Sequence, residues 1–88
     1  MPELSRFAGI IIYMYFRDNE RHNKPHIHAE YAEHKAEVAL DGELLAGELP
    51  VRQMKMLTGW LAFHEEELYA AWNKAVQGLQ FGKIEPMK

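Results

Sequence analysis

The stretch HIHAEYAEHKAEVALDGELLA, residues 26–46, alternates between apolar and polar residues over most of its length. A period of two is typical of β-strands that have one face buried and the other toward water. The side chains expected to face inward are Ile27, Ala29, Tyr31, Ala36, Val38 and Leu40. Asp41 and Gly42 form a typical hairpin turn, which predicts a further short strand over residues 43–46.

A second strand-forming segment, residues 7–16, comes before this region. It is rich in β-branched and aromatic residues, which favour strand over helix. Because both of its alternating faces are apolar, we expect both to be covered, as in a central strand. The polar residues 17–25 then form a loop that ends at a proline. These segments predict a three- to four-stranded antiparallel β-meander over residues 7–46.

From residue 50 onward, apolar residues recur at steps of three and four, which is typical of an amphipathic helix. Pro50 suits the first turn of a helix, and Gly78 suits its C-terminal end. Three successive glutamates at residues 65–67 favour the N-terminus of a second helix, so a break near His64 is expected. The helical segment, residues 50–78, is therefore one long helix or a kinked pair.

The predicted fold class is α+β: a single domain, residues 1–88, in which the helical segment packs on one face of the antiparallel meander. A tail, residues 79–88, follows. The chain has 88 residues, of which 48% are hydrophobic, and no cysteine, which excludes disulfides and thiol nucleophiles. We expect a cytoplasmic protein, because a cysteine-free chain suits a reducing compartment and its apolar runs are too short to span a bilayer.

Three of the five histidines, His22, His26 and His28, fall within seven residues. On a strand, His26 and His28 point the same way, about 6.5–7 Å apart along the backbone. They are a candidate chelating pair, with Glu30 one step further on that face and His22 arriving from the loop. Such a set suits a divalent metal such as zinc. The alternative is that these are solvated histidines on an exposed strand face, turned away from the helices.

The same residues also allow chemistry without a metal. His26 or His28, with His22 as a further candidate, would act as a general base. The phosphate would be stabilised by Arg17, Arg21, Lys24 or Tyr15, as in a small ribonuclease. The net charge of −3 argues against a general nucleic-acid binder. A third hypothesis needs no catalytic group and makes the open sheet face a surface for a partner protein or a homodimer.

His64 lies in the apolar stripe of the helical segment. We interpret it as a core histidine that bonds to a strand carbonyl, with a metal-ligand role as the alternative. The helices are expected to cover the sheet face opposite to His26 and His28, which argues against that alternative.

Several stretches together resemble a family of small bacterial proteins, domain-of-unknown-function family 4160. They are SRFAGIIIYMYF, HNKPHIHAEY, GELPVR and the spaced Trp60, His64, Leu68 and Trp72. The family motif Asp-His-x-Pro-Pro-His-Phe-His maps onto His22, Pro25, His26 and His28, with Lys24 in place of the first proline and Ile27 in place of the phenylalanine. Where the family has the aspartate, this chain has Arg21, which removes one metal ligand unless Asp18 or Glu20 replaces it.

The resemblance raises the nuclease-like and the partner-binding hypotheses above metal catalysis. Such proteins are often encoded beside a second small protein in an arrangement like a toxin–antitoxin pair, with this family as the suspected toxin. We therefore expect a cognate partner protein, with RNA as the candidate target. The resemblance also singles out His22, His26 and His28 as the residues on which function depends.

Overall fold

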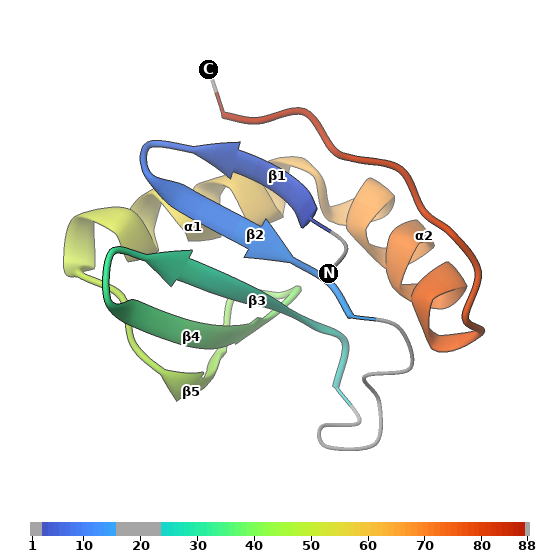
Figure 1. The fold of residues 1–88 in the computed structure, drawn as a ribbon, viewed down its shortest axis with the longest axis horizontal. Helices are drawn as coiled ribbons and strands as arrows, with labels where there is room; N and C mark the ends of the chain where they lie inside the picture. Colours follow the sequence, from blue (N-terminus) through green and yellow to red (C-terminus); the bar gives the residue numbers. More distant parts are fainter. Residues whose placement is uncertain (1–2, 16–23, 88) are drawn as a thin grey trace.

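The structure, a computed structural model, describes residues 3–15 and 24–87. Over these residues the chain forms one five-stranded antiparallel sheet, in chain order, followed by two helices (Figure 1). The strands are β1 (Glu3–Phe7), β2 (Ile10–Tyr13), β3 (His26–Tyr31), β4 (His34–Ala39) and β5 (Leu44–Gly47), and the helices are α1 (Val51–Phe63) and α2 (Glu65–Val76). The predicted α+β class and meander are confirmed, with one strand more than the upper prediction.

The additional strand comes from a turn inside the first apolar segment. Ala8 and Gly9 have φ values of 50° and 77°, as in the two-residue turns of tight hairpins. Phe7 and Ile10 pair directly across this turn. Alanine rarely adopts a positive φ, so the turn is hard to recognise within an apolar run. The meander therefore begins at Glu3 rather than at residue 7.

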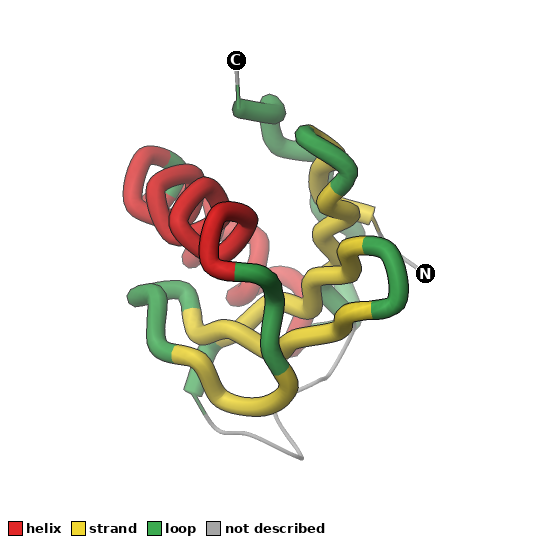
Figure 2. Tube along the Cα trace, turned by 90° about the vertical axis from the view of Figure 1, so that its left-hand side faces the viewer, coloured by secondary structure: helices red, strands yellow, loops and turns green. Residues whose placement is uncertain are grey.

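One face of the sheet packs against the helices and forms the core. Ile12, Ala29 and Ala36 are register partners on three adjacent strands, so their side chains lie in a row on that face. All three are buried, as the alternation predicts. Figure 2 shows helix beside one face of the sheet, and buried residues of both α1 and α2 belong to the core. The large helical side chains that are completely buried in this core are Leu57, Trp60, Leu61 and Leu68.

The helical segment divides at His64, as its acidic triplet predicts. The His64 backbone N–H donates to the Trp60 carbonyl at 3.0 Å, and the His64 carbonyl accepts from the Leu68 N–H at 2.9 Å. Helical hydrogen bonding thus reaches the junction from both sides. Glutamates in the first turn of α2 interact favourably with its macrodipole.

α2 ends beside Gly78, close to the predicted position, and the chain then doubles back. Gly78 has a φ of 74°, and the Leu79 N–H donates to the Lys74 carbonyl at 2.9 Å, as in a Schellman motif. The tail runs back past α2 toward β1 (Figure 1). There the Ile84 N–H donates to the Leu4 carbonyl at 2.8 Å, so the tail covers part of the outer edge of β1.

Two glycines are expected to respond in opposite directions to replacement by alanine. A Cβ at Gly59, inside α1, would lie 3.8 Å from Met87 Cε, an ordinary contact. Gly59→Ala should raise the free energy of unfolding by about 0.5–1 kcal/mol, the helix-interior cost of glycine. Gly47 has a φ of 69°, and its Cβ would overlap the Lys35 carbonyl oxygen. Gly47→Ala should lower the free energy of unfolding by more than about 1 kcal/mol.

Urea unfolding followed by circular dichroism measures both free energies. A stabilising Gly47→Ala change would contradict the backbone conformation described at that strand end.

Candidate metal centre

β3 and β4 bring two histidines and one glutamate together on the outer face of the sheet. His26 and His28 are two positions apart on β3 and therefore lie on the same face of the sheet. The antiparallel register places Glu37 of β4 directly opposite His28. One ligand atom from each of these three side chains lies within 4.8 Å of the other two. Among the described residues, these three side chains are the one group of His, Asp and Glu that could hold a metal ion. We call them the three-ligand group.

His28 is in contact with both a carboxylate and an aromatic ring. Its Nδ1 lies 3.7 Å from Glu37 Oε1. The Tyr15 ring meets the imidazole edge-on, with 4.4 Å between the ring centroids. The His28 and Glu37 side chains are 21% and 11% exposed, so both still have some contact with solvent.

His26 is completely buried and is held from two sides. Its Nδ1 lies 2.9 Å from the Lys24 carbonyl oxygen, an acceptor. This contact favours the tautomer with hydrogen on Nδ1 and the lone pair on Nε2. The Trp72 ring of α2 lies 5.2 Å away, centroid to centroid. The expectation that His26 is exposed and turned away from the helices is wrong, because α2 reaches the beginning of β3.

Lys24 is anchored to the turn between β4 and β5. Its Nζ lies 2.8 Å from Asp41 Oδ2 and 2.6 Å from Glu43 Oε1. Asp41 and Glu43 raise the pKa of Lys24, and Lys24 with the Glu43 backbone N–H lowers the pKa of Asp41. Exposed ion pairs contribute little stability. Their consequence here is positional, because they hold the residue whose carbonyl bonds to His26.

Of the other residues predicted as metal ligands on β3 or in the loop before it, Glu30 is the one that the structure describes, and it does not join this group. Glu30 lies opposite Lys35 in the β3–β4 register and is not one of the three ligands. His22 and Arg21 lie outside the described residues, as do the substitutes proposed for the missing aspartate. Sequence reasoning missed Glu37, although the alternation of β4 already places it on the outward face.

His64 belongs to the junction of the helices. Its Nδ1 lies 2.9 Å from Glu67 Oε1, and its ring centroid lies 5.3 Å from that of Trp60. The partner is therefore a side chain of the next helical turn rather than the strand carbonyl that we expected. His64 is 8% exposed and is not part of the three-ligand group.

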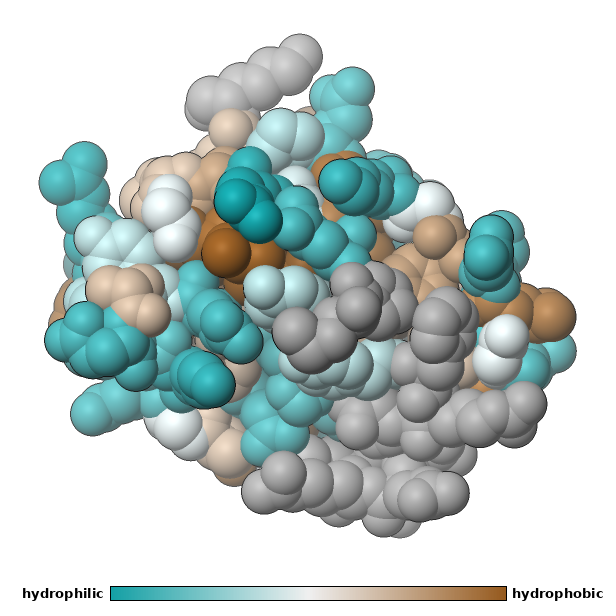
Figure 3. Space-filling model, viewed as in Figure 1, coloured by the Kyte–Doolittle hydropathy of each residue, from teal (hydrophilic) through white to brown (hydrophobic). Residues whose placement is uncertain are grey.

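The outer face of the sheet is turned toward the viewer in Figures 1 and 3, since α1 lies behind the strands in that view. The coloured surface in Figure 3 is mostly hydrophilic, with small apolar spots between the polar side chains. Among the residues coloured there, we see no large apolar area of the kind that marks protein-docking surfaces. Neither helix of the described chain has the length and apolar character needed to cross a membrane.

Comparison with known proteins identifies a family whose description names no function. The family described as Domain of unknown function (DUF4160) matches residues 9–73, a range that includes the whole three-ligand group. No curated protein and no solved structure shows a significant match.

The ion pairs of Lys24 lead to a measurable prediction. Because the pKa of Asp41 is lowered in the fold, its ionised form adds stability above the ordinary value of 3.8, and that stability is lost as the pH falls through the lowered pKa. In Lys24→Met, the Asp41 pKa should return toward 3.8. Titration of the Asp41 side-chain carboxyl carbon by NMR measures this. An unchanged Asp41 pKa in Lys24→Met would contradict the ion pair.

Proposed function

The chain belongs to the family Domain of unknown function (DUF4160), whose description assigns no activity, and we propose that this protein binds a divalent transition-metal ion. The ligands are His26, His28 and Glu37, and zinc is the best-fitting ion. The observation that carries this proposal is the convergence of the three ligand atoms within 4.8 Å.

The spacing of the ligands is close to that of a bound ion. Ligand atoms at about 2.0–2.2 Å from a tetrahedral zinc are roughly 3.4 Å apart. The distance between His28 Nδ1 and Glu37 Oε1, 3.7 Å, is close to this value. A ring nitrogen of His26 lies within 4.8 Å of a ligand atom of each of the other two residues. The β3–β4 register thus supports the proposal, because it brings the three side chains near the spacing of zinc ligands.

The chemical nature of the ligands selects the class of ion. Imidazole nitrogen is a good ligand for zinc, copper, nickel and iron, whereas magnesium and calcium prefer oxygen ligands. Two histidines and one carboxylate also recur in zinc sites that keep a position for water. A zinc-bound water is more acidic than bulk water, which would make the open position suited to hydrolysis.

The surroundings of His26 favour binding as well. Metal-bound histidines usually donate their second ring N–H to a carbonyl or carboxylate, which fixes the ring orientation. The Lys24 carbonyl oxygen lies 2.9 Å from His26 Nδ1, which is within hydrogen-bond distance. The Lys24 side chain is in turn fixed by Asp41 and Glu43. Less conformational freedom would then have to be lost when an ion binds.

The toxin–antitoxin-like role stays a prediction, as do a cognate partner and a cytoplasmic location. An RNA-directed activity has less support than metal binding. The positive charge of Lys24 is largely compensated by Asp41 and Glu43, so it is a poor phosphate ligand. Arg17 and Arg21, the other cations proposed for this role, lie outside the described residues.

Zinc should stabilise the fold if it binds the three-ligand group. A tag-free, chelator-treated sample should bind one zinc per chain. A free zinc concentration 100-fold above its Kd should add about 2.7 kcal/mol of stability and raise Tm by about 10–20 °C. The same concentration of magnesium should have no such effect. Calorimetry measures Tm, and elemental analysis of the dialysed sample measures the stoichiometry.

Single substitutions locate the ion. His28→Ala and Glu37→Gln should each remove most of the zinc-dependent rise in Tm. The matched control is His34→Ala, because His34 is a half-exposed histidine of β4 outside the three-ligand group. In NMR spectra, zinc should shift the indole N–H signal of Trp72, whose ring contacts His26. A wild-type protein unaffected by zinc, or a full zinc effect in both His28→Ala and Glu37→Gln, would refute the proposal.

A further inference from the structure

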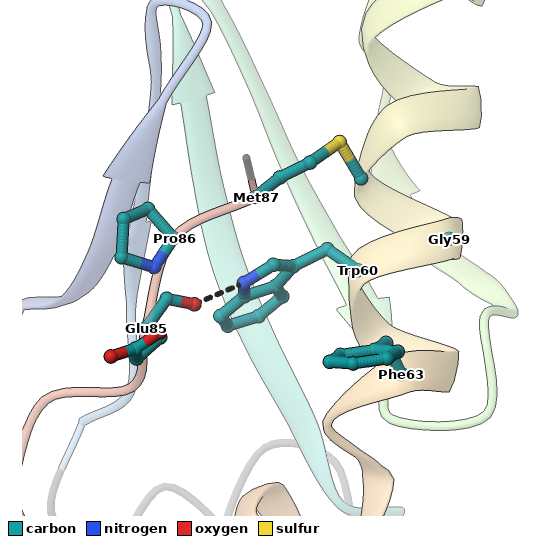
Figure 4. Close-up of a pocket in the computed structure, with 6 residues that line it drawn as sticks. All are labelled: Gly59, Trp60, Phe63, Glu85, Pro86 and Met87. Carbon is teal, nitrogen blue, oxygen red and sulfur yellow. Dashed lines mark hydrogen bonds between the residues drawn. The ribbon is translucent and has the colours of Figure 1, made fainter.

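A hollow lies between α1 and the C-terminal tail, and it shares no residue with the three-ligand group. Its volume is about 570 Å³, within the range of ligand pockets. It is lined by Gly59, Trp60, Phe63, Glu85, Pro86 and Met87 (Figure 4). The side chains of Trp60, Phe63 and Met87 are large and apolar, so the hollow suits an apolar or aromatic group.

The wall of the hollow that comes from the tail is fixed by hydrogen bonds. The Trp60 indole N–H donates to the Glu85 carbonyl at 2.8 Å (Figure 4). One residue earlier, the Ile84 backbone bonds to β1. Beyond Pro86, the Met87 side chain reaches from the tail toward Gly59. The hollow is therefore largely formed before any ligand arrives.

Phe63 is an unusual residue at the mouth of this hollow. It is 84% exposed, the highest value among the exposed large apolar side chains of the described residues. Phenylalanine is not a strong helix former, so the end of α1 does not require it. An exposed aromatic ring beside an apolar hollow is characteristic of the residues that anchor a protein partner.

Acidic side chains continue the surface on the other side of Phe63. Glu65, Glu66 and Glu67 are exposed at the start of α2 and line, with Phe63 and His64, an adjoining hollow of about 430 Å³. Neither hollow has a lysine or arginine in its lining. Phe63 lines both, so an apolar pocket and a negatively charged surface meet at this residue.

We propose that this surface binds a basic segment of a partner protein. An aromatic or large aliphatic side chain of the partner enters the hollow over Trp60, and flanking lysines or arginines face the three glutamates. Charge complementarity selects this occupant. A second copy of this chain, docked through the same surface, would bring glutamates against glutamates. Nucleic acids and anionic lipids are repelled for the same reason.

Three pentapeptide amides test both features of the occupant on the full ¹⁵N-labelled chain. Lys-Lys-Phe-Lys-Lys carries the charge and the anchor, Lys-Lys-Ser-Lys-Lys lacks the anchor, and Glu-Glu-Phe-Glu-Glu reverses the charge. The reporter is the Trp60 indole N–H signal, because that group lies in the hollow, and the Trp72 indole serves as the internal reference. The first peptide should shift the Trp60 signal saturably and bind at least about tenfold more tightly than the other two.

Surface substitutions then locate the binding. Phe63→Ala should weaken binding of Lys-Lys-Phe-Lys-Lys at least about fivefold, and the double change Glu65→Gln and Glu66→Gln should weaken it and reduce its salt dependence. Val51→Ala is the matched control, since Val51 is a 72% exposed apolar residue of α1 outside this hollow. All these residues are exposed, and circular dichroism verifies the fold of each variant.

The proposal is overturned by any of three results. These are equal affinity for the serine peptide, equal affinity for the glutamate peptide, and unchanged binding in Phe63→Ala. A Trp60 signal that none of the peptides shifts would overturn it as well.

Discussion

The antiparallel register between β3 and β4 is the constraint on which the core and the candidate metal centre both depend. Ile27 lies opposite Val38 on the inner face, and His28 lies opposite Glu37 on the outer face. Strand side chains alternate, so a slip of one residue would expose the apolar pair and bury the polar one. The burial of Ile27 and Val38 therefore stabilises the same register that brings a carboxylate to His28.

The helices supply the burial of His26, which the sheet alone does not provide. Trp72 of α2 packs against His26 and removes that histidine from solvent. The position of α2 depends in turn on the junction at His64, where one helix ends and the next begins. A metal ion at the three-ligand group would therefore stabilise not only the sheet but also the packing of α2 against it.

The two proposed binding surfaces use separate parts of the fold and different physical forces. The three-ligand group relies on donor atoms of two adjacent strands, with a hydrophilic surface around the outer face. The hollow at Phe63 relies on apolar contacts between α1 and the tail, and on the negative charge that begins at Glu65. Because they share no residue, a failure of one proposal leaves the other intact.

The sequence by itself determined the α+β class, the helix break at His64 and the shared direction of His26 and His28, because each is encoded in a local period or a local charge pattern. Only the tertiary structure decided that Glu37, rather than Glu30, completes the group, since periodicity does not record which residues of two strands face each other. It also decided the burial of His26, which depends on a helix more than forty residues further along the chain. The hollow at Phe63 likewise exists only because the tail returns to α1.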